Sequence, residues 1–169
     1  DNADVLFVNT CTIRENADDK LYGTLGHLKK WKSLAPNRRL LVGGCAAQKD
    51  KELVRERAPW VDVVIGTHNT TDIINLLNQA EDWGPVTEII QETTNIETEI
   101  AAIRESSVSA FVTIQIGCNN SCTFCIVPSV RGVEISRRPS DIINEIKTLA
   151  HDGVKAVSYT HLRAHETLL

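Results

Sequence analysis

The chain has 169 residues, with 18 lysines and arginines against 22 aspartates and glutamates, so its formal net charge is -4. This balance excludes a polybasic tail for nucleic acid binding, and 42% hydrophobic with 24% charged residues is the composition of an ordinary globular protein. No apolar run approaches the ~20 residues of a membrane-spanning helix, and the first residues lack the charges and apolar stretch of a signal peptide. We therefore expect a cytoplasmic protein without a membrane partner.

Methionine is absent, so the chain does not begin with an initiator residue. An apolar run of strand length at residues 5–8 is preceded by only four residues, as if a domain were entered midway. These features predict that the chain is a fragment.

Residues 1–83 repeat one pattern three times: an apolar run of strand length followed by a polar or glycine-containing segment. The runs span 5–8, 39–42 and 61–65 and lead into Cys11, Cys45 and His68. Helical patterns lie between and after them: an apolar face of Ala17, Leu21, Leu25 and Leu28, a shorter polar helix over 50–57, and a helix that starts near Thr70. Alternating strands and helices predict an α/β domain on a parallel sheet of three or more strands.

Ligands of such sheets bind beyond the carboxyl ends of the strands. Cys11, Cys45 and His68 each follow a predicted strand closely, so we expect them to line the same edge of the sheet. For His68 a hydrogen-bonded role at the strand end is a simpler interpretation than a ligand role.

Residues 84–109 are rich in glutamate and predict an acidic connector, within which residues 88–91 are compatible with a short strand. A second domain begins at residue 110 with a predicted strand over 110–116. A helix starting at Pro139-Ser140-Asp141 and a strand over 154–157 follow, which together predict the first βαβ unit of another parallel α/β domain.

Cys118, Cys122 and Cys125 lie on one loop directly after the strand at 110–116. Five cysteines with three of them clustered do not suggest a disulfide framework in a cytoplasmic chain. Structural zinc sites and ordinary iron-sulfur clusters both take four protein ligands. Three thiols leave one iron of a cubane open to a small molecule, which favours catalysis. A zinc-binding interaction module without catalysis stays open as an alternative.

The spacing of these three cysteines resembles that of the radical S-adenosylmethionine enzymes. The flanking residues 117–128, 131–132 and 136–139 resemble the methylthiotransferase branch, and so do the segments 9–11, 43–48 and 66–69 of the first domain. The resemblance extends from residue 1 to about residue 157.

This resemblance implies a methylthiotransferase N-terminal α/β domain followed by the start of a partial (β/α) barrel. It implies two 4Fe-4S clusters in the full-length enzyme, with Cys118, Cys122 and Cys125 holding the catalytic one. The open iron of that cluster would bind S-adenosylmethionine, and Phe124 stands where the family places an aromatic residue next to the adenine. Cys11 and Cys45 match two of the three ligands of the second cluster, and the third would lie upstream of residue 1.

Residues 12–17 and 20–22 resemble the members that add a methylthio group to C2 of N6-isopentenyladenosine, next to the anticodon of tRNA. Relatives that modify threonylcarbamoyladenosine or an aspartate of a ribosomal protein are the alternatives. The resemblance implies a tRNA anticodon stem-loop as substrate, a reductant such as flavodoxin or ferredoxin, and a monomeric enzyme. Arg131, Arg137 and Arg138 are candidates for contact with tRNA phosphates. We expect this fragment alone to be inactive, because most of the barrel is missing.

Residues 158–169 depart abruptly from the family pattern, which predicts a non-native tail whose His161 and His165 are not ligands. The predicted organisation is therefore an N-terminal domain at 1–83, an acidic linker at 84–109, a radical S-adenosylmethionine core segment at 110–157, and a tail at 158–169.

Overall fold

The computed structural model describes residues 3–12, 15–91 and 108–160. The chain divides into two compact units, Asp1–Glu92 (unit 1) and Thr93–Leu169 (unit 2). Most of the predicted acidic linker and most of the predicted tail lie outside the described residues. Among the helices in the described part of the chain, none is long and apolar enough to cross a membrane.

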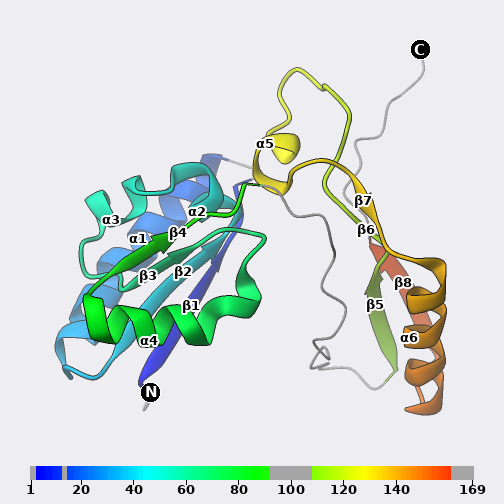
Figure 1. Ribbon diagram of the computed structural model, residues 1–169, viewed down its shortest axis with the longest axis horizontal. Coiled ribbons are helices and arrows are strands. Elements are labelled where there is room, and N and C mark those ends of the chain that lie inside the picture. The colour runs from blue at the N-terminus through cyan, green and yellow to red at the C-terminus, as the bar shows by residue number, and fades with distance from the viewer. Residues whose placement is uncertain (1–2, 13–14, 92–107, 161–169) are drawn as a thin grey trace. The chain divides into compact units, whose positions relative to one another are not determined.

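A parallel sheet of four strands forms the centre of unit 1, in the order β1-β2-β3-β4 (Figure 1). The strands are β1 (Val5–Thr10), β2 (Arg39–Gly44), β3 (Val63–Ile65) and β4 (Val86–Glu88). The predicted parallel α/β sheet is thereby confirmed. The fourth strand ends at Glu88, earlier than the stretch 88–91 suggests, because Val86 is the residue that pairs with Val63 of β3.

Helices cover both faces of this sheet. They are α1 (Glu15–Ser33), α2 (Cys45–Asp50), α3 (Leu53–Arg57) and α4 (Ile73–Trp83), the last preceded by the short 3-10 helix η1 (Thr70–Asp72). The single helix predicted over 50–57 is wrong, because the chain becomes helical already at Cys45 and breaks at Lys51, whose φ is 52°. Consequently α2 follows β2 directly and starts with a cysteine.

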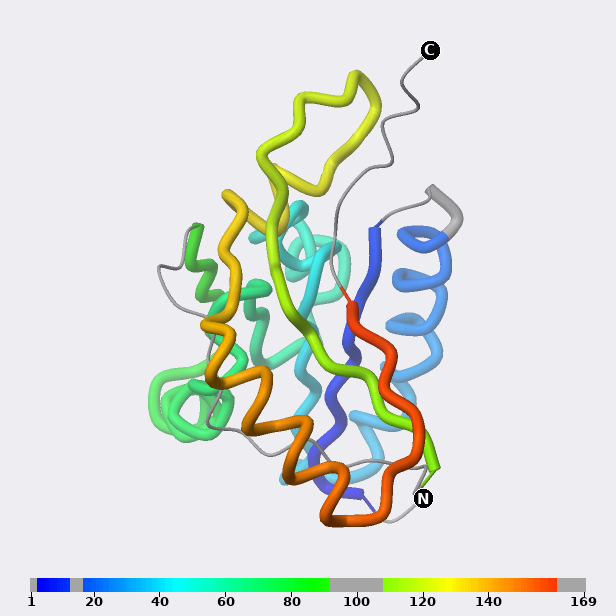
Figure 2. The backbone as a smooth tube through the Cα atoms, turned by 90° about the vertical axis from the view of Figure 1, so that its right-hand side faces the viewer, coloured from blue at the N-terminus to red at the C-terminus, as the bar shows by residue number. Residues whose placement is uncertain are grey.

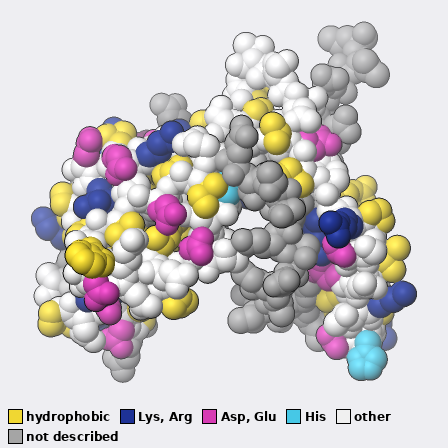
Figure 3. All heavy atoms as spheres, viewed as in Figure 1, with side chains coloured by type: hydrophobic (Ala, Val, Ile, Leu, Met, Phe, Trp, Pro, Cys, Tyr) yellow, Lys and Arg dark blue, Asp and Glu magenta, His cyan; other side chains and the backbone are white. Residues whose placement is uncertain are grey.

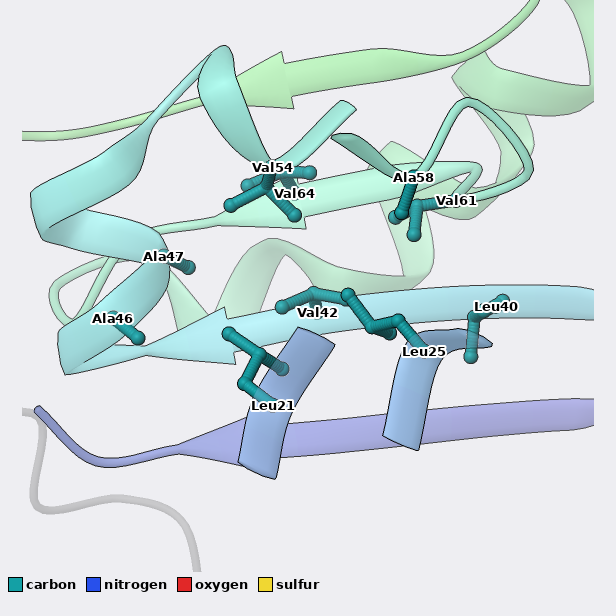
Figure 4. Packing of buried hydrophobic residues seen from close by; sticks show 10 residues of the cluster. All are labelled: Leu21, Leu25, Leu40, Val42, Ala46, Ala47, Val54, Ala58, Val61 and Val64. Atoms are coloured by element: carbon teal, nitrogen blue, oxygen red, sulfur yellow. The ribbon is translucent and has the colours of Figure 1, made fainter. Parts of the chain in front are cut away.

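The core of unit 1 explains why β2 has a continuous apolar run. Leu40 and Val42 point to one face, where Leu21 and Leu25 of α1 pack together with residues of α2 and α3 (Figure 4). Leu41 points to the other face, where it meets Leu76 of α4. Successive residues of a strand point to opposite faces of the sheet, and helices cover both faces here. The residues of β2 that point to either face are therefore buried. Each large side chain buried in this way stabilises the fold by about 1.5–3 kcal/mol.

Unit 2 contains a parallel strand pair and a short antiparallel pair. They are β5 (Ser109–Thr113) with β8 (Ala156–Thr160), and β6 (Gln115–Ile116) with β7 (Ile135–Ser136). The one strand predicted over 110–116 is therefore two strands in two sheets, divided at Ile114. The division arises because the amide of Arg137 bonds to the carbonyl of Ile114, which holds β7 against the chain after β5.

Helix α6 (Pro139–His151) connects the two strand pairs and lies along β5 and β8, as Figure 2 shows. Leu149 of α6 packs on Ala110 and Val112, so β5, α6 and β8 form the predicted βαβ unit. The helix begins after Arg138 without a side-chain cap, and Pro139 occupies its first turn. Strand β8 starts at Ala156 rather than Val154 and continues to Thr160, so it includes the first residues of the predicted tail.

Candidate functional site

Two cysteines lie at neighbouring strand ends of unit 1. Thr10 of β1 and Gly44 of β2 form the last pair of the parallel register, and Cys11 and Cys45 are the residues that follow them. Cys11 is exposed, whereas Cys45 is only 5% exposed. The structure therefore brings these two predicted ligands to one sheet edge, and half-buried His68 follows the end of β3 on the same edge.

Gly44 makes the turn from β2 into α2 possible. Its φ is 95°, and a Cβ atom there would lie 2.6 Å from the carbonyl oxygen of Thr10 and 2.6 Å from the side-chain oxygen of Asn9. A larger residue would be strained in this backbone conformation and would collide with β1. The approach of β1 thus explains the glycine that precedes Cys45.

Thr10 fixes the first turn of α2. Its hydroxyl donates to the carbonyl of Gly43 at 2.6 Å and accepts from the amide of Ala46 at 3.1 Å. The first amides of a helix have no partner inside the helix, so this hydroxyl supplies one. The backbone around Cys45 is consequently tied to β1.

Two buried amide side chains hold the other loops of this edge. Gln48 of α2 accepts from the amide of Thr67 at 2.9 Å and donates to the carbonyl of Ile90 at 2.9 Å. Asn69 accepts from the amide of Gly66 at 3.0 Å and donates to the carbonyl of Glu88 at 3.0 Å. Buried polar groups of this kind are stable only when paired, as these are. Neither residue shows this role in the sequence pattern.

A group of polar side chains connects the residue after Cys11 to α1 and α2. Thr12 donates to one oxygen of Asp18 at 2.9 Å, and Lys49 forms an ion pair with the other oxygen. Lys49 also lies 3.4 Å from Asp50, which accepts a hydrogen bond from Tyr22 at 2.6 Å. We call these five residues the Asp18 network.

The electrostatics of the Asp18 network favour its present protonation state. Burial alone lowers the pKa of Lys49, but the hydrogen bond to Asp18 and the charge of Asp50 outweigh it, so the pKa of Lys49 is raised. Burial, followed by the hydrogen bond to Asp50, raises the pKa of Tyr22 far above its usual value, against a smaller opposing effect of Arg57. The guanidinium of Arg57 lies 4.7 Å from the centre of the Tyr22 ring.

In unit 2 the cysteine triplet also starts at a constrained glycine. Gly117 has a φ of 71°, and a Cβ atom there would lie 2.0 Å from the carbonyl oxygen of Val133. The next residue, Cys118, is 4% exposed and donates its amide to the carbonyl of Gly132 at 3.2 Å. The two strands at the base of the loop therefore approach so closely that only glycine fits before Cys118.

Hydrogen bonds also hold the loop beyond Cys118. The amide of Cys125 donates to the carbonyl of Cys122 at 3.1 Å, and Asn119 accepts from the amide of Glu134 at 2.9 Å. Helix α5 (Val127–Arg131) then returns the chain to β7. Phe124, between two of the cysteines, is 95% exposed, so its ring is accessible to a ligand.

The thiols suit a cluster by their chemistry rather than by their present positions. Within the described ranges, no group of three or more His, Cys, Asp or Glu side chains lies close enough together to hold a metal ion. Three thiols within eight residues of one loop are nevertheless the soft donor set that iron-sulfur clusters take. By its chemistry, the donor set therefore fits such a cluster.

The three predicted phosphate contacts are not equivalent. Arg137 is 9% exposed, donates to the carbonyl of Thr113 at 2.9 Å and forms an ion pair with Glu145 at 2.6 Å. Arg138 is exposed at the start of α6, and Arg131 is half-buried at the end of α5. The geometry gives Arg137 a structural role at the base of the loop, so the prediction of phosphate contact depends on Arg131 and Arg138.

Figure 3 shows basic and acidic side chains interspersed over the described part of unit 1 in that view. This distribution agrees with the formal net charge of -4.

Two family models match the chain. Residues 1–66 match Uncharacterized protein family UPF0004, and residues 112–161 match the Radical SAM superfamily. The second match overlaps the start of the predicted tail.

Curated relatives match both units together. The proteins named tRNA-2-methylthio-N(6)-dimethylallyladenosine synthase from Cutibacterium acnes and Mycolicibacterium smegmatis are 50% and 49% identical over 157 and 158 residues, which is 92% and 93% of this chain. The protein of the same name from Corynebacterium efficiens is 48% identical over 159 residues. The chain spans 32% and 31% of the length of the first two relatives, about a third.

Proposed function

We propose that this chain, with its UPF0004 segment and its radical SAM segment, is part of a tRNA methylthiotransferase. The whole enzyme adds a methylthio group to C2 of N6-isopentenyladenosine next to the anticodon. The proposal rests on one continuous stretch of similarity that includes the cysteines of both units. The relatives that share this stretch all carry the same name. The alternatives, threonylcarbamoyladenosine in tRNA and an aspartate of a ribosomal protein, have no comparable support.

In this proposal the loop of unit 2 binds the catalytic 4Fe-4S cluster through Cys118, Cys122 and Cys125. A bound cluster of this kind supplies the electron for cleavage of S-adenosylmethionine, and the protein contributes position and exclusion of water. The constrained turn at Gly117 fixes the backbone directly before Cys118. Phe124, exposed beside the ligands, offers a flat apolar face for the adenine.

The edge of unit 1 contributes Cys11 and Cys45 to a second cluster in the full-length enzyme. Their positions directly after a register pair support this role, because neighbouring strand ends bring two thiols to one side of the sheet. We further propose a cytoplasmic, monomeric enzyme that takes electrons from a flavodoxin or ferredoxin. Arg131 and Arg138 would contact phosphates of the tRNA anticodon stem-loop.

A chimera tests this function, since the chain covers only part of its relatives. Residues 1–157 replace the matching segment of the Mycolicibacterium smegmatis protein, and the chimera is expressed in a strain that lacks that protein. We expect 2-methylthio-N6-isopentenyladenosine to reappear in tRNA hydrolysates measured by mass spectrometry, and Cys118→Ser in the chimera to abolish it. A folded, iron-loaded chimera that leaves N6-isopentenyladenosine unmodified would contradict the proposal.

A further inference from the structure

The Asp18 network joins three segments that are separate in the sequence. Asp18 lies in the first turns of α1, Thr12 lies between β1 and α1, and Lys49 lies in the last turn of α2. Each oxygen of the Asp18 carboxylate serves a different segment, one toward Thr12 and one toward Lys49. This single side chain therefore bridges the residue after Cys11 and the helix that begins with Cys45.

Thr12 is, like Gln48 and Asn69, a buried polar residue of this sheet edge. It is a polar residue only 7% exposed, and it directly follows the exposed Cys11. Its hydroxyl donates a hydrogen bond to Asp18, and this bond ties the chain to α1 as it leaves β1. Losing that bond would free the backbone at Cys11 while the sheet itself stays paired, because Thr10 and the residues before it remain in register with β2.

Lys49 forms the second connection of the Asp18 network. Lys49 is only partly exposed and lies between Asp18 and Asp50, so its ammonium is held by carboxylates from α1 and α2. Asp50 is held in turn by the hydroxyl of Tyr22 from α1. The network thus fixes α2 against α1 near its C-terminal end, whereas Thr10 fixes the N-terminal end at Cys45.

We propose that Asp18 is a positioning residue that holds the Cys11 segment against α2, so that the thiols of Cys11 and Cys45 can share one metal centre. The inference deepens the proposed function, because the shared centre would be the second cluster. Partly exposed ion pairs contribute little to stability, so a purely structural role would leave only a small trace in stability and none in thiol chemistry. A positioning role also predicts nearly unchanged folding, but together with impaired metal chelation by the thiols.

Cadmium binding tests the proposal without any cluster or enzyme activity. The background is the 169-residue chain with Cys118→Ser, Cys122→Ser and Cys125→Ser, in which Cys11 and Cys45 are the remaining thiols. The readouts are the cadmium-thiolate absorbance and the dissociation constant for Cd²⁺. In this background we expect one Cd²⁺ bound by both thiols.

Variants at Asp18 should then weaken the site. Asp18→Ala should raise the dissociation constant about tenfold, the usual scale for losing a group that orients ligands. Asp18→Asn keeps an acceptor for Thr12, so its dissociation constant for Cd²⁺ should lie between those of the background and Asp18→Ala. The matched control is Asp19→Ala, because Asp19 is the exposed neighbour on the same helix turn and should leave the constant unchanged.

Thr12→Val provides a second, nearly isosteric variant in case Asp18→Ala fails to fold. It removes the hydroxyl from the other end of the same hydrogen bond and should also weaken Cd²⁺ binding. The proposal is overturned if Asp18→Ala or Thr12→Val folds and binds Cd²⁺ as tightly as the background, or if the background binds Cd²⁺ through one thiol only. The chimera assay is independent of this result, so failure here and failure of the proposed function can be told apart.

Discussion

The two units contain the same local device in different surroundings. In each, a glycine with positive φ stands at the end of a strand or directly after it, and the next residue is a buried cysteine: Gly44 is the last residue of β2 and precedes Cys45, and Gly117 follows β6 and precedes Cys118. In unit 1 the chain after the cysteine enters a helix that is packed in the core and bonded to Thr10. In unit 2 it enters an open loop that carries the fully exposed Phe124.

This difference indicates that the two thiol sites are ordered by different means. The edge of unit 1 is built by buried apolar and amide side chains, so its geometry exists before any ligand binds. In unit 2 the loop carries Phe124, which is 95% exposed, between the half-buried Cys122 and Cys125, so we expect these cysteines to take their final positions from the group they bind. Substitutions in each unit test this difference.

The largest expected effect is on unit 1. Gly44→Ala places a Cβ atom 2.6 Å from the backbone oxygen of Thr10 in a backbone region that alanine avoids, so we expect unit 1 to lose about 3 kcal/mol of stability. Urea unfolding followed by circular dichroism measures it. Gly26→Ala is the control, because Gly26 lies in α1 with open space around it and should gain a few tenths of a kcal/mol to about 1 kcal/mol. Equal stability of the two variants would contradict the claim that the approach of β1 requires glycine at position 44.

The equivalent change in unit 2 should act on metal binding instead. Gly117→Ala would meet the carbonyl oxygen of Val133, so the entry of Cys118 into the loop would shift. We expect most of the iron bound after anaerobic reconstitution to be lost, while the unfolding transition of unit 1 stays where it was. Normal iron content in this variant would show that the turn does not position Cys118.

A smaller loss of stability should follow from removing a buried amide of unit 1. Gln48→Leu removes the hydrogen bonds to the amide of Thr67 and to the carbonyl of Ile90, and each such bond contributes about 0.5–1.5 kcal/mol. We expect a total loss of about 2 kcal/mol in urea unfolding. Gln79→Leu, at an exposed position of α4, is the matched control and should change stability by less than about 0.5 kcal/mol.

The smallest effect concerns alkaline pH. The pKa of Tyr22 is raised in the folded chain, so Tyr22 ionises first in the unfolded chain. The stability that neutral Tyr22 contributes is therefore complete below the pKa of tyrosine in the unfolded chain, near 10. This stability is lost as the pH rises beyond that value. Lys49, whose pKa is also raised, acts in the same direction. At pH 8, Tyr22→Phe should be about 1 kcal/mol less stable than the parent, because the bond to Asp50 is missing.

This deficit should shrink between pH 8 and pH 11, as the parent loses the contribution of Tyr22 and the variant does not. Urea midpoints at both pH values measure it, with Tyr159→Phe in unit 2 as the control. A constant difference across this range would argue against a raised pKa at Tyr22.

The sequence predicted what depends on local periodicity and spacing. The apolar runs of β1, β2 and β3 and the spacing of the leucines in α1 reveal the parallel sheet and its covering helix without any partner being known. The cysteine triplet was equally visible, because its spacing lies within one loop. The proximity of Cys11 and Cys45 was predictable once the strands were recognised as parallel.

Features that depend on contacts between distant residues could not be predicted. The start of α2 at Cys45 depends on the hydroxyl of Thr10, and the division of the strand at Ile114 depends on Arg137. The roles of Gln48 and Asp18 could not be predicted from the sequence for the same reason, because the identity of a polar residue does not indicate its hydrogen-bond partner. Arg137 is the clearest case, because a basic residue in a loop gives no sign of its ion pair with Glu145.

The central claim, that the loop of unit 2 binds an iron-sulfur cluster, is tested most directly by iron and sulfide analysis after anaerobic reconstitution of the 169-residue chain. We predict about four iron and about four sulfide ions per chain, lost in Cys118→Ser and retained when Cys11 and Cys45 are both replaced by serine. One zinc ion per chain with no labile sulfide would contradict the claim and favour a zinc-binding module.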